Sequence, residues 1–162
     1  MDERTEELRQ AEYQTPCPGF SHAPHTADEI VIAKGRTLEE AFEQAALGVY
    51  EIITDTSNVN HEIEKVIEDE GLDLYQLLYK WIEDLLFFTD TEHLVFSKFK
   101  VESIERIHKG SEVVYRIRGK AWGEQFNLEK HKPRTIVKAA TYAMMKIEKI
   151  DGCWLVRFVV DI

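Results

Sequence analysis

Cysteines are few in this chain, and a long apolar run is missing. Its 162 residues include two cysteines, Cys17 and Cys153, which form no C-x-x-C motif and no paired framework. Because the N-terminus also lacks a signal-peptide pattern, we predict an intracellular protein, cytoplasmic or nuclear, with free thiols. No stretch approaches the roughly 18 consecutive apolar residues that a membrane helix needs, so no membrane contact is expected.

The common catalytic signatures are also absent. The sequence contains no G-x-x-x-x-G-K-[ST] loop, no G-x-G-x-x-G, no G-x-S-x-G and no H-E-x-x-H. Two cysteines are too few for a Cys-rich zinc site, whereas a site made of histidine and carboxylates remains open. No catalytic residue is therefore predicted, and carboxylates are the main candidates for chemistry.

Basic residues are outnumbered. The chain has 20 Lys and Arg against 30 Asp and Glu, a formal net charge of −10. Binding to nucleic acid depends on Lys and Arg displacing the counterions of the phosphates. We therefore expect no direct nucleic-acid binding, and any link to nucleic acid should run through a basic protein partner.

The chain divides into a short leading segment and one domain. Residues 1–19 are charged and then interrupted by prolines and a glycine, without apolar periodicity. We interpret them as a flexible N-terminal tail or a frayed helix outside the core. Residues 20–162 are predicted to form a single domain, large enough to bury a core without a disulfide or metal.

Two helices are predicted from apolar residues that recur every three or four positions. The first begins at Thr37, where Glu40 completes a capping-box pattern, and ends near a D-T-S-N turn. The second begins after Asp73, a favourable cap. Its apolar stripe includes Trp81, which we interpret as core. Two acidic residues of this helix are interpreted as a solvated polar face: Glu83 and Asp84.

The other periodic segments alternate apolar and polar residues, as half-buried strands do. They lie at about 30–34 and 62–68, from 94 towards a turn at 109–110, and at 113–122, 140–150 and 153–161. The pair Asp151-Gly152 suits a two-residue type I′ hairpin. Together these segments predict an α+β fold, a two-layer sandwich with a mostly antiparallel sheet and the two main helices packed on one face.

The last strand pattern ends in two anions. By strand parity Asp161 shares a face with Arg157 and Val159, and the α-carboxylate of Ile162 follows one residue later. Two negative charges at the end of a buried strand repel each other unless a cation neutralises them. A hard cation such as Ca²⁺ or Mg²⁺ would do so, and Asp28 would help complete its oxygen ligands. The alternative is a solvated C-terminus in which Asp161 pairs with Arg157.

Two further sites have two interpretations each. The segment from His25 to Asp28 precedes a strand. It is either a self-bonded turn, in which the Thr26 and Asp28 side chains satisfy nearby backbone groups, or a functional element in which His25 and Thr26 brace the turn that presents the Asp28 carboxylate. Lys138 interrupts an apolar stretch, and its side chain either extends outward or meets the carboxylates.

Several blocks of this sequence, taken together and in order, resemble the archease family. They are H-T-A-D, G-R-T-L-E-E-A-F-E-Q-A-A-L-G, I-T-D-T, L-D-L-Y-Q-L-L-Y-K-W-I-E-D-L-L, A-W-G-E-Q-F, E-K-H-K-P, V-K-A-A-T-Y and the terminal V-V-D-I. The resemblance extends from about residue 25 to residue 162 and does not include the first 20 or so residues. It implies an α+β fold.

The resemblance also implies a function. Members of the family act as a protein cofactor of the tRNA-splicing ligase RtcB: they promote guanylylation of the ligase and its multiple turnover, and are not themselves the enzyme. By the same resemblance a divalent metal, calcium or alternatively Mg²⁺ or Mn²⁺, is bound by Asp28, Asp161 and Ile162. His25 and Lys138 are implied as supporting residues that contact phosphate or the partner, with a guanine nucleotide expected in the complex.

The sequence departs from the family at one point, because Pro24 stands where an acidic residue is common. No extra carboxylate is therefore expected there, and the position of Asp28 is unaffected. Two other functions stay open: a metal-dependent hydrolase that processes nucleotides with Asp28 and Asp161, and a general chaperone or interaction module without a metal.

Overall fold

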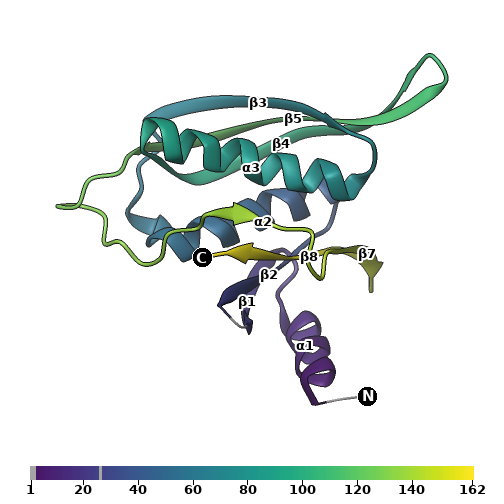
Figure 1. Cartoon of the computed structure of the whole chain (residues 1–162), viewed down its shortest axis with the longest axis horizontal. Coiled ribbons are helices and arrows are strands. Elements are labelled where there is room, and N and C mark those ends of the chain that lie inside the picture. The colour runs from purple at the N-terminus through teal and green to yellow at the C-terminus, as the bar shows by residue number, and fades with distance from the viewer. Residues whose placement is uncertain (1–2, 26) are drawn as a thin grey trace.

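Two antiparallel sheets enclose two helices (Figure 1). The computed structural model describes residues 3–25 and 27–162, so Thr26, expected to brace the turn before Asp28, lies outside the described residues. The five-stranded sheet consists of β1 (Gly19–His25), β2 (Asp28–Gly35), β8 (Cys153–Asp161) and β6 (Ala139–Ala140) in that order, with β7 (Lys146–Ile150) also paired to β8. The three-stranded sheet has the order β3 (Ile63–Gly71), β5 (Glu112–Gln125) and β4 (Leu94–Lys109).

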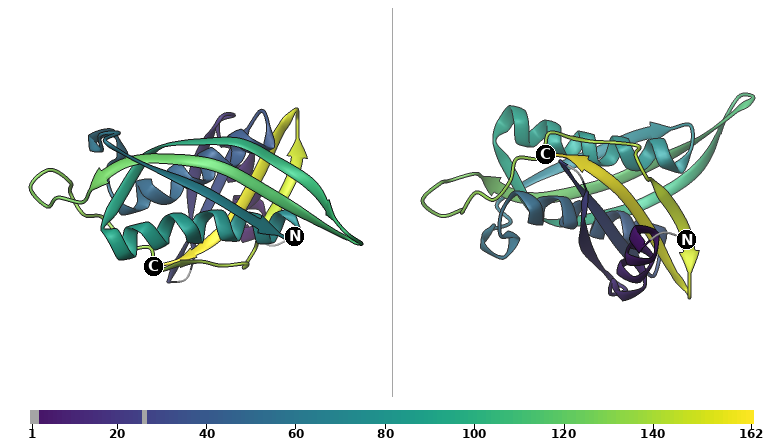
Figure 2. Two further views of the ribbon diagram at one scale, coloured as in Figure 1. Left: turned by 90° about the horizontal axis from the view of Figure 1, so that it is seen from above. Right: turned by 60° about the horizontal axis from the view of Figure 1, so that its bottom comes forward.

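Helices α2 (Leu38–Ile53) and α3 (Leu74–Glu92) lie between the two sheets, as both views of Figure 2 show. The α+β class and the antiparallel pairing are confirmed. The strands form two sheets, however, where the sequence led us to expect one. Alternation tells which face of a strand is buried but not which partner it pairs with, so the division was not visible in the pattern.

The two predicted helix starts are confirmed. The side chain of Thr37 accepts a hydrogen bond from the backbone N–H of Glu40, and that of Asp73 accepts one from Gln76. Glu40 also accepts from the N–H of Arg36, one residue before the cap. Each bond satisfies a donor of the first turn that has no partner inside the helix, which fixes where the helix begins.

The core is formed by the facing sides of α2, α3 and both sheets. Trp81 is fully buried, as predicted, and its indole N–H donates to the backbone oxygen of Phe42 at 3.0 Å. This bond ties α3 to α2 at the centre of the molecule, and a buried indole N–H without a partner would be costly. No helix of the described residues is long and apolar enough to cross a membrane.

The strands predicted from the sequence differ from the observed ones at two places. Strand β1 was not predicted, because its histidines and Pro24 suggested a loop; it is an edge strand, which pairs on one side only and can include proline. The segment 140–150, predicted as one strand, is divided into β6 and β7 by a turn with Met144 at φ 55°. The turn at Asp151-Gly152 has φ values of 51° and 79°, as a type I′ turn requires.

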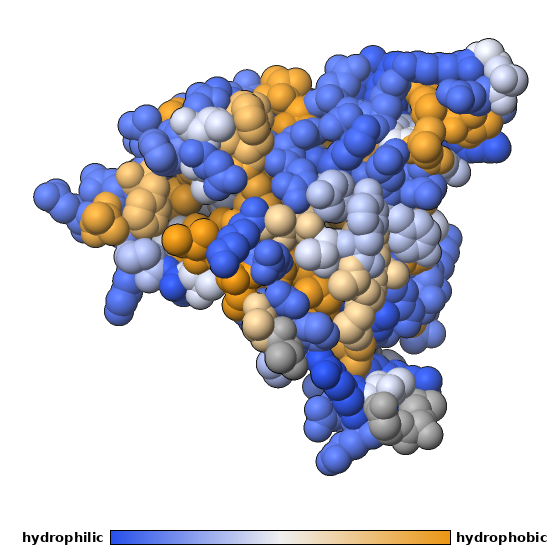
Figure 3. Space-filling model, viewed as in Figure 1, coloured by the Kyte–Doolittle hydropathy of each residue, from blue (hydrophilic) through white to orange (hydrophobic). Residues whose placement is uncertain are grey.

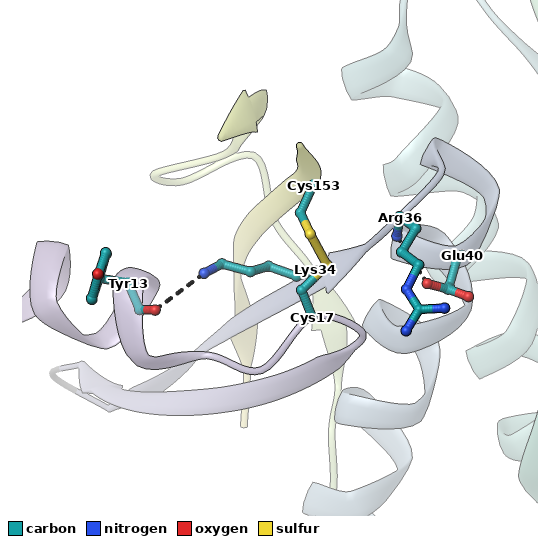
Figure 4. Close-up of a disulfide and its surroundings, with 6 residues drawn as sticks. All are labelled: Tyr13, Cys17, Lys34, Arg36, Glu40 and Cys153. Carbon is teal, nitrogen blue, oxygen red and sulfur yellow. Dashed lines mark hydrogen bonds between the residues drawn. A yellow bond between two sulfur atoms is a disulfide. The ribbon is translucent and has the colours of Figure 1, made fainter. Parts of the chain in front are cut away.

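The cysteines are joined, so the prediction of free thiols was wrong. Cys17 and Cys153 form a disulfide across a separation of 136 residues (Figure 4). The bond links the segment after α1 (Glu3–Gln14) to the first residue of β8. Two cysteines so far apart in sequence give no pairing signal, because it is the fold that brings them together.

The described part of the segment 1–19 is also more ordered than the flexible tail that we expected. Helix α1 packs its Leu8 and Ala11 on one face of the five-stranded sheet. We call this the outer face; its side chains come from alternate residues of β2 and β8: Asp28, Ile30, Ile32, Lys34, Leu155, Arg157, Val159 and Asp161. The carboxylate of Glu12 is buried and pairs with Arg157 and Lys146. Only two apolar residues of α1 are used, so periodicity did not reveal it.

Candidate carboxylate site

The predicted site residues meet at one end of the five-stranded sheet. Asp28 of β2 lies directly opposite Asp161 of β8, and His25 of β1 lies directly opposite Asp28. Ala139 of β6 lies opposite Asp161 on its other side. These four residues form one line across four strands, which we call the carboxylate row. Asp28 and Asp161, which are far apart in sequence, are thus neighbours through strand pairing.

Asp28 and His25 interact directly. Nδ1 of His25 lies 3.3 Å from Oδ2 of Asp28, and the two side chains are 26% and 28% exposed. The contact uses one carboxylate oxygen and leaves the other without a partner among the described residues. The two interpretations of this segment therefore combine: the turn is held by a side-chain bond, and the Asp28 carboxylate still has an oxygen to offer.

Asp161 does not pair with Arg157, so that alternative was wrong. The guanidinium of Arg157 donates to the carboxylate of Glu12 and, at 2.8 Å, to the backbone oxygen of Met144. The predicted parity is confirmed, since Arg157 shares the outer face with Asp161, but α1 binds its charge. Within the described residues the Asp161 carboxylate has no hydrogen bond or ion pair. Partly buried Ile162 follows it and packs against the main core.

Lys138 lies beside the row. Its backbone N–H donates to the backbone oxygen of Asp161 at 2.7 Å, the bond with which β6 begins to pair with β8. Its side chain is exposed, and its ammonium group contacts no carboxylate in the described part of the chain. The outward interpretation therefore describes the side chain, while the backbone keeps the residue next to Asp161.

The donor atoms of the row suit a hard cation. Asp28, Asp161 and the α-carboxylate of Ile162 offer only oxygen, the ligand that Ca²⁺, Mg²⁺ and Mn²⁺ prefer. Opposed residues of an antiparallel pair have Cβ atoms roughly 5 Å apart, which allows two carboxylates to converge on one ion. No group of three His, Cys, Asp or Glu side chains in the described chain could hold a metal. A cation here would therefore need the terminal carboxylate as its third anion.

Glu83 positions the edge of the sheet, which the sequence did not suggest. Its Oε1 accepts a hydrogen bond from the backbone N–H of Ala140 in β6 at 3.0 Å, and burial raises the pKa of its carboxyl group. Asp84 is not a plain solvated residue either: burial and the neighbouring Asp69 raise its pKa to about 7. The interpretation of these two residues as a solvated face was wrong, because α3 lies between sheets and has no fully solvated side here.

Ring contacts extend this edge. Tyr142, two residues after β6, stacks on Tyr79 of α3 with ring centroids 4.6 Å apart and planes 13° apart. The negative charge of Glu83 lies close enough to the hydroxyl group of Tyr79 to raise the pKa of that group. The only sequence signal of this arrangement was the V-K-A-A-T-Y block itself, in which Lys138 and Tyr142 stand four positions apart.

Comparisons with known proteins agree on one family. The model of the Archease protein family matches residues 20–162. Protein archease of Aeropyrum pernix is 53% identical over 146 residues, which cover 90% of this chain and 99% of that protein. The solution structure of Methanobacterium thermoautotrophicum protein 1598 has a TM-score of 0.72 and 36% identity, covering 90% of this chain and 99% of that one.

A second solved structure shares the fold. It is the crystal structure of an archease from Thermotoga maritima, titled a possible chaperone, with a TM-score of 0.50 and 19% identity, covering 86% of this chain and 94% of that one. The family model begins at residue 20, so α1 precedes the matched region.

Proposed function

Because this chain belongs to the archease family, we propose that it is a protein cofactor of an RtcB-type tRNA-splicing ligase. In this role it promotes guanylylation of the ligase and multiple turnover, while the ligase itself joins the RNA ends. The observation that supports this most is the carboxylate row, in which Asp28 and Asp161 are brought side by side from opposite ends of the chain without a Lys or Arg contact among the described residues.

In the proposal Asp28, Asp161 and the α-carboxylate of Ile162 hold a divalent cation, Ca²⁺ or alternatively Mg²⁺ or Mn²⁺. When bound, such an ion supplies positive charge that attracts and orients phosphate oxygens. His25 holds the Asp28 carboxylate in place through its 3.3 Å contact. The exposed ammonium group of Lys138 adds a second positive charge next to the row, suited to the phosphates of a guanine nucleotide in the complex.

The charge of the whole protein favours the same kind of partner. A net charge of −10 attracts a basic, RNA-binding surface and speeds encounter with it, whereas it repels free RNA. We accordingly propose contact with the ligase and none with nucleic acid or membrane. We propose an intracellular site of action, and the disulfide is compatible with it because intracellular proteins of hyperthermophilic archaea and bacteria do contain disulfides.

Single-turnover guanylylation of the ligase tests this function directly. Ligase, GTP and the metal are mixed with and without the full-length protein, and the covalent guanylate on the ligase is followed. We expect at least a tenfold faster reaction with the protein, and little nucleotide turnover by the protein alone. Equal rates with and without it would refute the cofactor role. Turnover of GTP by the protein alone, abolished by Asp28→Asn, would favour the hydrolase.

A second candidate, a general chaperone or interaction module, has one observation in its favour. The loop over 126–138 exposes two large apolar side chains, Leu128 at 74% and Ile136 at 78%, and Figure 3 shows apolar surface on the side of the molecule where this loop protrudes. Exposed apolar surface is a common feature of interaction sites. Addition of one glycine after Ile162 separates the candidates: it displaces the terminal carboxylate and should abolish ligase stimulation, but should leave a chaperone activity of this loop intact.

A further inference from the structure

An exposed aromatic stack lies along the edge strand β6, close to the carboxylate row. Tyr142 is 50% exposed although one face of its ring is covered by Tyr79. Among the described residues, Tyr79 is the only aromatic ring that contacts it. A large ring that is fixed on one side and open on the other is suited to a flat apolar ligand.

The stack is rigidly held from both sides. On one side, Tyr79 belongs to α3, and Glu83 of the same helix accepts a hydrogen bond from the backbone N–H of Ala140 in β6 at 3.0 Å. Thr141 donates both its backbone N–H, at 3.0 Å, and its hydroxyl group, at 2.8 Å, to the backbone oxygen of Val159. These bonds fix the chain immediately before Tyr142, so little side-chain or backbone freedom would be lost when a ligand stacks on the ring.

The distance between the tyrosine stack and Lys138 matches the distance between the base and the phosphates of a nucleotide. β6 starts beside the C-terminus and extends away from it, as the short yellow-green arrow above β8 shows in Figure 1. Lys138 and Tyr142 stand four positions apart in a nearly extended segment, so their Cα atoms are separated by roughly 13 Å. This is comparable to the distance from the base of a nucleoside triphosphate to its last phosphate.

The surrounding charges differ along this edge. The carboxylates of Glu83 and Asp73 lie close enough to the tyrosines to act on them. Phosphate would be repelled there, but a neutral base is not. At the other end the ammonium group of Lys138 contacts no carboxylate in the described chain. Because Ala139 is the residue opposite Asp161, strand parity places the Lys138 side chain on the other face from that carboxylate, where it can bind phosphate.

We propose that the open ring face of Tyr142 binds a nucleobase whose phosphates lie at the ammonium group of Lys138, at the end of β6 that adjoins the carboxylate row. The proposal builds on the cofactor role above and names the ligand of the same site. Stacking on an aromatic ring does not select between bases, so the site is expected to accept purines generally and to contribute affinity. In keeping with the absence of nucleic-acid contact proposed above, we assign the base to a free nucleotide; an RNA end offers the same chemistry and is the alternative that the test below distinguishes.

The KM for GTP in ligase guanylylation tests the proposal. With saturating protein, Tyr142→Ala should raise this KM about tenfold, as expected for loss of one base–aromatic stack. Tyr142→Phe keeps the ring and should stay within about twofold of the wild type. Tyr13→Ala is the control, since Tyr13 is an exposed tyrosine of α1 that lies outside the site. Inorganic triphosphate has no base, so its inhibition constant should be the same for wild type and Tyr142→Ala.

A labelling experiment gives a readout that does not depend on ligase activity. The full-length protein, alone and with ligase, is irradiated with 8-azidoguanosine triphosphate, and the labelled residue is found by mass spectrometry. We expect label at Tyr142, and protection by GTP or by an RNA fragment identifies the source of the base. If the wild type fails to stimulate the ligase, the cofactor role is lost while this labelling still decides the tyrosine site. An unchanged KM for Tyr142→Ala, or label confined to other residues, overturns it.

Discussion

The outer face of the five-stranded sheet contains charged groups at both ends, and the two ends treat them differently. At the end covered by α1, the carboxylate of Glu12 binds both Arg157 and Lys146, and the ammonium group of Lys34 donates to a backbone oxygen of α1 at 3.3 Å. At the other end, the carboxylate of Asp161 contacts no opposite charge within the described residues. The paired charges at the first end hold α1 on the sheet, whereas the unpaired carboxylate at the other end is available to bind a ligand.

Removal of the disulfide at the α1 end should cause the largest loss of stability. Cys17→Ser opens a loop closed over 136 residues, and the chain-entropy model predicts a loss of about 5 kcal/mol in the free energy of unfolding. Urea denaturation of wild type and variant measures this difference. Reductant should lower the wild type to the level of the variant and leave the variant unchanged. Equal stability of the two oxidised proteins would show that the disulfide contributes nothing.

Removal of the ion pairs at the same end should cause the second-largest loss of stability. Glu12→Ala leaves Arg157, which is 17% exposed, without its carboxylate, and we expect a loss of about 3 kcal/mol. Glu7→Ala is the matched control, because Glu7 is an exposed residue of the same helix and should change stability by less than about 0.5 kcal/mol. Similar values for the two variants would mean that the charge cluster does not hold α1.

In a carboxylate pair outside the site, one carboxyl group avoids repulsion between like charges by staying protonated. Asp84, buried beside Asp69, has a pKa of about 7 in place of the ordinary 3.8, so folding favours its protonated form. The unfolded chain ionises first as pH rises, and stability should therefore fall between about pH 4 and pH 7 and level off above. Asp84→Asn should remove this component, so the variant should gain on the wild type as the pH approaches 7. Parallel stability curves for the two proteins would contradict the shift.

The smallest effect on stability is expected at the carboxylate row. Asp161→Asn removes a charge that has no partner within the described residues and that lies opposite Asp28, so the free energy of unfolding should change by less than about 1 kcal/mol. Ligase stimulation, by contrast, should be lost. A large loss of stability would place Asp161 with the structural charges of the α1 end and remove the contrast between the two ends.

Local features of this fold were readable from the sequence. The caps Thr37 and Asp73, the buried Trp81 and the parity of Asp161 with Arg157 all follow from patterns a few residues long. Strand parity also predicted that Asp161 shares a face with Val159, so the side of the sheet that bears its carboxylate was known from the sequence.

Features that depend on distant pairing were not readable. The disulfide of Cys17 with Cys153 and the ion pair of Glu12 with Arg157 join residues more than 130 positions apart. Helix α1 lies outside the family resemblance, so no motif suggested where it packs. The need to neutralise two anions at the C-terminus suggested Asp28 as one further ligand beside Asp161, and the resemblance to archeases then assigned the two residues to one site. Strand pairing then brought them opposite each other.

Calorimetric titration of Ca²⁺ into the full-length protein tests the central claim most directly, namely that the carboxylate row is a cation site. The row predicts one bound ion per chain for the wild type and for Glu7→Ala. It predicts at least a hundredfold weaker binding for Asp28→Asn, whose folded state is checked by circular dichroism. Mg²⁺ and Mn²⁺ titrations rank the alternatives. Equal binding by wild type and Asp28→Asn, or no binding of any of the three ions by the wild type, would contradict the account.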